Sequence, residues 1–370
     1  MAVLKADAYG HSITLCGPAV VRAGARWLGV ACVEEGVAAR ALCPEARVLV
    51  FCGAFPGQGA AVVRHDLTAV VWQPWQLDEL ETAARAAGTA AGSVPVHLEI
   101  DTGMSRQGIT PENLGPEGAG VGALLGRFTP ESPLRLEGVM THLLAADEAD
   151  GRVTEAQLIL LDEALGKIKA AGFHPEWLHA GSSATLLAGE AARIAALAAR
   201  YGIKAMLRPG LAFYGVTPRF NPQFEGQEPA TLSAARVRLQ PVLSWKTRVA
   251  GVRAVPAGAV VGYNGTFVAT EPMRLALVAA GYADGLSRLL SNRFSLLVRG
   301  QRAPLVGRVS MDSAVVDVTE IDGVEPGDEV VILGEQGGES ITAYDHAEAT
   351  GTIPWEVFTR IGARVPRIGV

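Results

Sequence analysis

Lysine is scarce in this chain of 370 residues: it occurs only at positions 5, 167, 169, 204 and 246, and arginine supplies the other cationic side chains. The net charge of −6 leaves no basic surface for nucleic acid and no polybasic patch for a membrane. No apolar run is long enough to span a bilayer, and no basic and apolar leader opens the sequence. The four cysteines lie within the first 52 residues without metal-ligand spacing. We therefore expect free thiols in a reducing cytoplasm and no bound metal.

Apolar runs alternate with alanine-rich stretches over the first 215 residues, a pattern typical of βα units. It predicts helices over Gln76–Ala87 and Thr154–Ala171, the second with a capping box of Thr154 and Gln157 and an end at Gly172. Eight strands joined by helices predict an α/β fold, a (β/α)8 TIM-type barrel with its functional groups at the C-terminal strand ends. The predicted strands are Ala2–Lys5, Trp27–Val33, Arg47–Cys52, Leu67–Trp72, Val94–Asp101, Leu134–His142, Trp177–Ala180 and Ala205–Tyr214.

Short β-branched runs separated by turns follow from about Ser233, and they predict a C-terminal, mostly-β domain. The predicted strands there are Thr247–Val255, Leu275–Ala280, Arg293–Val298, Ala314–Val318 and Glu329–Leu333. We place the boundary in the polar, proline-containing stretch Thr217–Thr231, which gives a barrel of residues 1–225 and a β domain of residues 226–370.

Lys5 stands at the end of the first apolar run, in the segment Ala-Val-Leu-Lys-Ala-Asp-Ala-Tyr-Gly-His that ends at His11. Burial of an ammonium is costly and lowers its pKa. The resulting neutral amine is the form that makes a Schiff base. This segment alone is equally consistent with a strand-end lysine whose ammonium reaches solvent.

Three loops after predicted strands carry groups suited to anions. Arg106, in Asp101–Gly108, can bind a carboxylate in bidentate fashion. Ser183 and the backbone N–H groups of Gly210 and Leu211 can bind a phosphate, as the last strands of such barrels often do. Each loop by itself also fits a surface arginine or ordinary turn chemistry.

Two further residues, Tyr263 and His142, are candidates with strong structural alternatives. Tyr263 stands between glycines in the β domain, where its hydroxyl is free to project, although a hairpin tyrosine that packs on its neighbours fits the spacing better. Tyrosine is a poor base unless a cofactor acidifies the carbon acid. His142 is more often a satisfied barrel histidine than a catalyst, and it could hold Arg208 by a hydrogen bond.

Together these segments resemble alanine racemase, the pyridoxal-phosphate enzyme of fold type III, along nearly the whole chain. The Lys5 segment is similar to the cofactor-lysine signature of that family. Further similar segments occur in the expected order: Asp101–Gly108, Arg208–Gly215, Gly281–Gly285, Gly307–Asp312 and Trp355–Arg367.

The resemblance implies a two-base reaction. Lys5 binds pyridoxal phosphate covalently and acts as a base on one face of the substrate Cα, and the partner subunit's Tyr263 acts on the opposite face. Arg208 faces the pyridine nitrogen and leaves it unprotonated, because a guanidinium does not give up its proton. The implied enzyme is a homodimer with shared active sites.

The resemblance also implies the binding residues. Arg106 and the backbone of Met311 bind the substrate carboxylate, and Tyr282 narrows the entrance. The cofactor-binding set comprises Lys5, Tyr9, His142, Ser183, Arg208, Gly210, Leu211 and Trp355.

The sequence departs from the family at four places, one of them Ser182, where an asparagine is usual before the phosphate-binding serine. Glu99 stands where many members carry a carbamylated lysine, and we hypothesise that its carboxylate pairs directly with Arg106. Trp355 replaces a tyrosine that reaches the cofactor phosphate. The family has a strand and a helix before the cofactor lysine, whereas this sequence begins four residues ahead of it; we expect a misassigned start or a missing segment.

The resemblance implies interconversion of L- and D-alanine in the cytoplasm, which supplies D-alanine for peptidoglycan. The alternatives are a racemase of another small amino acid such as serine, and a pyridoxal-phosphate-binding homologue with weak or lost activity. A non-catalytic barrel protein is disfavoured by the β domain with Tyr263. A decarboxylase of this fold type is disfavoured because those enzymes place an acidic residue at the pyridine nitrogen.

Overall fold

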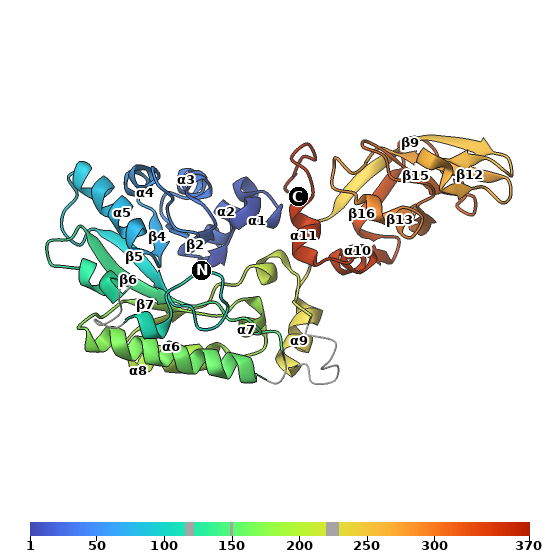
Figure 1. Cartoon of the computed structure of the whole chain (residues 1–370). Helices are drawn as coiled ribbons and strands as arrows, with labels where there is room; N and C mark the ends of the chain where they lie inside the picture. Colours follow the sequence, from blue (N-terminus) through green and yellow to red (C-terminus); the bar gives the residue numbers. More distant parts are fainter. Residues whose placement is uncertain (115–121, 149–150, 220–228) are drawn as a thin grey trace. The chain divides into compact units, whose positions relative to one another are not determined.

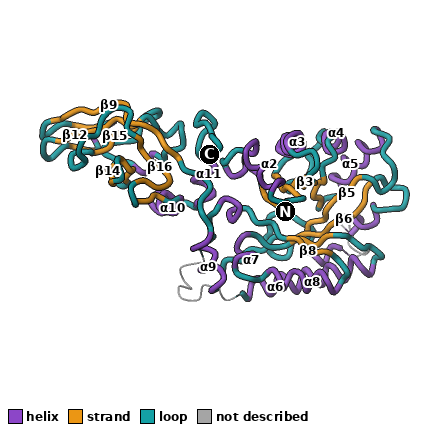
Figure 2. The backbone as a smooth tube through the Cα atoms, turned by 180° about the vertical axis from the view of Figure 1, so that it is seen from behind, coloured by secondary structure: helices purple, strands orange, loops and turns teal. Residues whose placement is uncertain are grey.

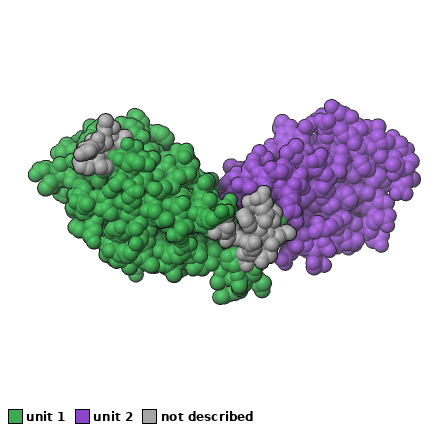
Figure 3. Space-filling model, turned by 60° about the horizontal axis from the view of Figure 1, so that its bottom comes forward, with its two compact units in different colours: residues 1–8, 12–240 green, residues 9–11, 241–370 purple. Residues whose placement is uncertain are grey.

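The computed structural model describes residues 1–114, 122–148, 151–219 and 229–370. They form two compact units, one of residues 1–8 and 12–240 and the other of residues 9–11 and 241–370 (Figure 3). The predicted boundary between residues 225 and 226 lies outside the described residues.

The first unit is built on eight parallel strands that pair in sequence order, with helices outside them (Figure 1). The first strand is joined to the segment just after the last one, where Met1 N donates to Leu207 O at 3.1 Å and Val3 N–H donates to Pro209 O at 3.2 Å. The predicted (β/α)8 TIM-type fold is confirmed. The strands are β1 (Ala2–Val3), β2 (Trp27–Val30), β3 (Arg47–Val50), β4 (Thr68–Val71), β5 (Val94–Glu99), β6 (Leu134–Met140), β7 (Trp177–His179) and β8 (Lys204–Met206).

The barrel strands are short and, apart from β8, mostly buried, and their apolar side chains contribute to the core. One cluster of buried apolar residues joins Trp27 of β2 to Leu49, Val70, Met140 and Met206 of other strands. Most of the predicted strands extend past the C-terminal ends of the observed strands, most clearly in the run Ala205–Tyr214. There β8 ends at Met206, and Leu211–Tyr214 forms a 3-10 turn (η3), because the chain bends at Pro209 and Gly210.

Helices cover the outside of the barrel, as the tube in Figure 2 shows. Helices α6 and α8 lie side by side there, joined by the Arg200–Asp162 ion pair at 3.0 Å. No helix among the described residues is both long and apolar enough to cross a membrane. The helices of this unit are α1 (Lys5–Tyr9, whose last residue belongs to the second unit), α2 (Ile13–Arg22), α3 (Val33–Leu42), α4 (Gly59–Arg64), α5 (Pro74–Ala86), α6 (Arg152–Ala170), α7 (Ser183–Leu187), α8 (Ala191–Arg200) and α9 (Ala230–Arg238), with 3-10 turns η1 (Pro111–Leu114) and η2 (Gly122–Arg127).

The predicted capping box of Thr154 and Gln157 is wrong. Helix α6 begins at Arg152, so both residues lie inside it and are buried. Gln157 instead accepts a hydrogen bond from Leu144 N–H at 2.7 Å and donates to His142 O at 3.0 Å. Its amide therefore fixes the loop that follows β6, which carries His142.

The second unit is mostly β, as predicted. Its main sheet is antiparallel, in the order β14-β13-β16-β9-β12-β15, with β17 paired to β16. A separate hairpin pairs β10 with β11. The elements are β9 (Trp245–Val255), β10 (Val260–Val261), η5 (Tyr263–Gly265), β11 (Phe267–Val268), β12 (Met273–Val278), η6 (Arg288–Leu290), β13 (Ser295–Val298), β14 (Gln301–Pro304), β15 (Ala314–Asp317), β16 (Glu329–Gln336), β17 (Glu339–Ile341), α10 (Ala343–Thr350) and α11 (Pro354–Thr359).

Candidate active site

Lys5 lies just beyond β1, at the start of a left-handed turn. Ala6, Asp7 and Ala8 have φ angles of 53°, 51° and 55°, and Tyr9 follows with 55°. A left-handed helical conformation costs about 1–2 kcal/mol for each L-residue. None of these four positions is a glycine, so the conformation needs support from contacts outside the turn.

The Lys5 side chain sits in a surrounding that favours the neutral amine. Burial lowers the pKa of Lys5 below its usual value, and the positive charge of Arg106 lowers it further. Cys52 and Glu35 act in the opposite direction without reversing the shift. The expected lowering of the Lys5 pKa is confirmed; a lower pKa favours the neutral amine, which is the form that makes a Schiff base.

Arg208 lies after β8 and is only 5% exposed. Its Nη1 donates to His179 O at 2.6 Å and to His179 Nδ1 at 3.3 Å, and its Nη2 donates to Thr141 O at 2.7 Å and to His142 Nδ1 at 3.2 Å. The predicted bond between His142 and Arg208 is confirmed. A guanidinium has five N–H donors, and within the described part of the chain only the Nε–H is left without a hydrogen-bond partner.

Burial lowers the pKa of Arg208 to about 10, which still leaves the guanidinium charged at neutral pH. Burial and the neighbouring Arg208 charge lower the pKa of His142 to about 3. His142 is therefore neutral at pH 7 and accepts a hydrogen bond through Nδ1, which places its proton on Nε2.

A buried chain of hydrogen bonds runs from Arg208 into the barrel. Because a guanidinium only donates, His179 accepts through Nδ1 and carries its proton on Nε2. That Nε2 therefore donates to Nδ1 of His97 at 2.7 Å. His97 in turn donates from Nε2 to Oε2 of Glu137 at 3.3 Å. Burial lowers the pKa of both histidines, so the neutral form of each is favoured.

Two arginines bind Glu137, which ends this chain of hydrogen bonds. Arg47 donates to both carboxylate oxygens of Glu137, at 2.8 and 2.6 Å, and Arg135 donates to Oε1 at 2.9 Å. Burial works to raise the pKa of Glu137, but the hydrogen bonds from His97 and Arg47 outweigh it and lower the pKa to about 2. Arg47 begins β3, so the network extends from the N-terminal strand ends to Arg208 beyond the C-terminal ends.

Ser183 and the loop after Arg208 form a small polar cradle. The Ser183 hydroxyl accepts hydrogen bonds from the N–H groups of Gly210 at 3.0 Å and Ala212 at 3.1 Å, with Leu211 between them. Gly181 has a φ of 81°, and a Cβ there would meet Thr185 at 2.6 Å. The structure thus brings the two predicted phosphate loops together, and a hydroxyl beside backbone N–H groups suits an anion.

Arg106 is exposed on the loop after β5. Asp101 shapes this loop by accepting hydrogen bonds from the N–H groups of Gly103 at 2.9 Å and Ser105 at 3.1 Å. The predicted pairing of Glu99 with Arg106 is wrong: in the described structure Glu99 accepts a hydrogen bond from Gln107 and makes none with Arg106. The reason is burial, since Glu99 is 2% exposed while Arg106 points to the surface.

Gln107 uses both hydrogens of its amide, one toward Glu99 and the other toward Phe51 O at 3.1 Å. Burial raises the pKa of Glu99 to about 7, although the bond from Gln107 and the charges of Arg208 and Arg106 act in the opposite direction. Glu99 therefore changes its charge near neutral pH, within electrostatic reach of two arginines.

The second unit presents its predicted residues on adjacent loops. Tyr282 N–H donates to Ser310 O at 3.0 Å, next to Met311. A Cβ on Gly262, which precedes Tyr263, would meet Arg308 N at 3.0 Å, so this loop packs on the same segment. The side chains of Tyr263, Tyr282 and Met311 are 68%, 44% and 53% exposed. They are available to a ligand or to another chain.

Trp355 is half-buried on α11. The same helix packs closely against residues 9–11: a Cβ on Gly10 would meet Phe358 O at 2.3 Å, and the His11 and Phe358 rings lie 4.9 Å apart. Arg367 donates to Gly10 O at 2.9 Å. The C-terminal segment thus holds the residues that directly follow the left-handed turn. Tyr9 is buried, which raises its pKa to about 12.

Sequence reasoning missed His97, His179, Glu137 and Gln107. The first three are buried polar residues on the mostly buried strands β5, β7 and β6. An isolated polar residue in a buried strand requires a partner, so this pattern could have identified them. No such signal exists for Gln107, because its role depends on how the loop folds back on Glu99.

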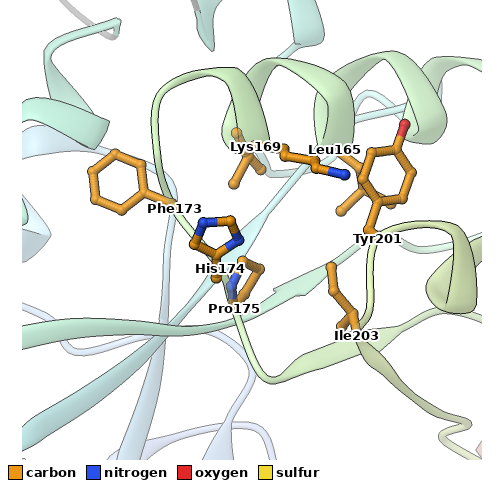
Figure 4. A pocket seen from close by; sticks show the side chains of 8 residues that line it. Leu165, Lys169, Phe173, His174, Pro175, Tyr201 and Ile203 are labelled. Carbon is orange, nitrogen blue, oxygen red and sulfur yellow. The ribbon is translucent and has the colours of Figure 1, made fainter.

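A small hollow lies elsewhere on the barrel, between α6 and the end of α8 (Figure 4). His174, Pro175 and Ile203 line it and directly precede β7 and β8, so it lies at the N-terminal strand ends. The active sites of such barrels lie at the opposite ends. The other lining residues are Leu165, Ile168, Lys169, Phe173 and Tyr201.

Comparison with known proteins gives a consistent result along the chain. The family model "Alanine racemase, N-terminal domain" matches residues 1–218, and "Alanine racemase, C-terminal domain" matches residues 242–369. An alanine racemase of Symbiobacterium thermophilum is 39% identical over 368 residues, covering 99% of this chain and 89% of the relative.

Solved structures agree with this result. The alanine racemase of Streptomyces lavendulae is 36% identical, with a TM-score of 0.84, and the match covers 100% of this chain and 90% of that one. The alanine racemase of Bartonella henselae, solved with covalently bound pyridoxal phosphate, is 26% identical, with a TM-score of 0.79 and coverage of 100% and 92%.

The hydrogen-bond chain predicts the protonation of three histidines. We expect His97, His142 and His179 to be neutral at pH 7, each with its proton on Nε2. ¹⁵N NMR spectra of the protein measure this protonation state, and the signal that disappears in His142→Asn is assigned to His142. Unfolded histidine protonates near pH 6.5, whereas folded His142 protonates only near 3. The unfolded state therefore binds more protons between these values, and stability falls as the pH drops below about 6.5. A proton on Nδ1 of His179 would contradict the assignment.

Proposed function

The chain belongs to the alanine racemase family and is an amino-acid racemase, and we propose that it uses pyridoxal phosphate attached at Lys5. The surroundings of Arg208 carry this proposal. Four of its donors are held by the protein, and the Nε–H is left to bind an acceptor such as a pyridine nitrogen. The residues present therefore fit the cofactor.

Pyridoxal phosphate, when bound, supplies an electron sink that acidifies the substrate Cα–H. Lys5 would hold the cofactor through its amine, whose pKa burial lowers, and would exchange a proton at the substrate Cα. Arg208 keeps its own proton and leaves the pyridine nitrogen unprotonated. This moderates the electron sink and favours simple proton exchange over transamination.

We assign the cofactor phosphate to Ser183, Gly210 and Leu211, with Tyr9 and Trp355 as further contacts. The cradle of hydroxyl and N–H groups around Ser183 supports this assignment. Trp355 offers an N–H where the family has a hydroxyl. His142 acts through Arg208, which it holds in place.

We propose that Tyr263 is the second base and that it acts in the active site of a partner subunit in a homodimer. Its exposure, together with that of Tyr282 and Met311 on adjacent loops, supports a role toward another chain. Arg106 and the Met311 backbone bind the substrate carboxylate, and Tyr282 narrows the entrance.

We propose that the reaction takes place in the cytoplasm and supplies D-alanine for peptidoglycan. The four cysteines are free thiols, as expected in a reducing compartment. A racemase of this kind makes the D-isomer available from the common L-amino acid pool.

The replacement Lys5→Ala tests the cofactor site. We expect D-alanine formation from L-alanine, with added pyridoxal phosphate, to fall by about a thousandfold or more, because both the covalent link and one base are lost. Lys204→Ala is the matched control, since the exposed Lys204 ammonium pairs with Glu176 at 2.9 Å and lies over the Trp177 ring at 5.3 Å, contacts that do not involve Lys5. Retained activity in Lys5→Ala would contradict the proposal. L-serine in a parallel assay tests the alternative substrate.

Mixing two inactive variants tests whether the sites are shared. Lys5→Ala and Tyr263→Phe should each be inactive alone. After subunit exchange, half of the dimers are mixed and each has one site with both native residues, so about a quarter of native activity should return. The recovery is measured against protein concentration, and light scattering gives the oligomeric state. If Tyr263 acts within its own chain, no activity returns.

Glu99→Gln tests the role of the buried carboxylate. With a pKa of about 7, Glu99 is mostly ionised at pH 8 and mostly protonated at pH 6. We propose that its charge and its bond to Gln107 support Arg106, so the KM for L-alanine should rise at pH 8 by up to about tenfold. At pH 6 the variant should resemble the native enzyme. Unchanged KM and kcat at both pH values would refute this role.

A further inference from the structure

The carboxylate of Glu35 joins the turn after Lys5 to the end of the neighbouring strand. Glu35 lies in the first turn of α3, which follows β2. Its Oε1 accepts a hydrogen bond from Ala6 N–H at 2.6 Å, and its Oε2 accepts one from Ala31 N–H at 2.8 Å. The Glu35 side chain thus binds two backbone amides, one just beyond β1 and the other just beyond β2.

This link begins where the pairing of the two strands ends. Beyond the β1–β2 ladder, Leu4 N–H still donates to Gly29 O at 2.8 Å. The chain then turns left-handed at Ala6, whose N–H donates to the Glu35 side chain and not to a backbone carbonyl. The Glu35 carboxylate takes over as the acceptor, so the connection between the two segments continues through a side chain.

The amide that Glu35 holds belongs to the peptide unit between Lys5 and Ala6. A peptide unit is planar, so a fixed Ala6 N–H also fixes the Lys5 carbonyl and the backbone angle ψ of Lys5. That angle determines where the Lys5 side chain leaves the backbone. Asp7 supports the same turn from the other side, because its Oδ1 accepts a hydrogen bond from Ile13 N–H at 2.7 Å.

We propose that Glu35 is a positioning residue for Lys5: its carboxylate holds the left-handed turn in the one conformation that aims the amine into the site. The effect of Glu35 on catalysis rests on the proposed function of Lys5. The hydrogen bonds that Glu35 makes with Ala6 and Ala31 do not depend on that function. The negative charge of Glu35 also lies close enough to oppose, in part, the lowering of the Lys5 pKa.

Only an ionised carboxylate of this length meets both amides. Glutamine has the same size but one acceptor oxygen, so its NH₂ group would face a backbone N–H. Aspartate is one methylene shorter and cannot span the same two amides. The neighbouring Glu34 is a matched control, because it is exposed and its side chain bonds to Gln58 Nε2 at 2.8 Å rather than to the turn.

Hydrogen exchange of the cofactor-free protein tests the structural link. In Glu35→Gln we expect amides of the peptide covering residues 4–12 to exchange at least about fivefold faster, while the remaining barrel peptides stay unchanged. Glu34→Gln should exchange like the native chain. Unchanged exchange in Glu35→Gln, or faster exchange throughout the barrel, would overturn the proposal. Should Glu35→Gln fail to fold, Glu35→Asp replaces it, with the same expected direction.

Cofactor capture tests the consequence for Lys5. Pyridoxal phosphate is added to each protein, borohydride reduces the adduct at timed intervals, and mass spectrometry locates the label. We expect labelling of Lys5 to be at least about tenfold slower in Glu35→Gln and unchanged in Glu34→Gln, at a temperature well below unfolding. An equal rate in Glu35→Gln would overturn the positioning role. If the native protein gains no label at Lys5, the proposed function is contradicted. The hydrogen-exchange experiment would still test whether Glu35 holds the turn after Lys5.

Discussion

The buried guanidinium of Arg208 is the group on which the centre of the barrel depends. A desolvated charge is stable only when its donors are satisfied, and here the ends of two neighbouring strands supply the acceptors, Thr141 O and His179 O. Burial, with a further contribution from the Arg208 charge, lowers the pKa of His142 and His179, and the guanidinium donors fix the tautomers of both rings. The position of a single cation thus sets the hydrogen-bond direction of a network that extends through His97 to Glu137.

The second constraint is local strain at Lys5. Four successive residues without a glycine adopt a left-handed conformation, which an isolated peptide would not maintain. The fold supports it by a β1–β2 ladder before the turn and by Glu35 and Asp7 after it. Such strain is stored where function requires a defined side-chain direction. In this chain it occurs directly beside the lysine that we assign to the cofactor.

The chemistry is distributed over both units. The barrel holds a lysine with a lowered pKa, a buried guanidinium and a polar cradle, whereas the β unit carries exposed tyrosines on adjacent loops. Large exposed aromatic side chains near a functional loop fit a role toward another molecule. In the function that we propose, the first set of groups binds the cofactor and the second contributes Tyr263 as a further proton-exchanging side chain.

The sequence by itself determined the fold class, the β character of the C-terminal unit and the loops that carry Lys5, Arg106, Ser183 and Arg208. These follow from hydrophobic periodicity and from motifs that lie within a few residues of one another. Only the tertiary structure decided the partners of buried polar groups. Glu99 binds Gln107 rather than Arg106, Gln157 holds a loop instead of capping a helix, and Glu35 reaches Ala6 across 29 positions. A hydrogen bond depends on atomic distance and direction, and these are fixed only when separate strands and helices have packed together.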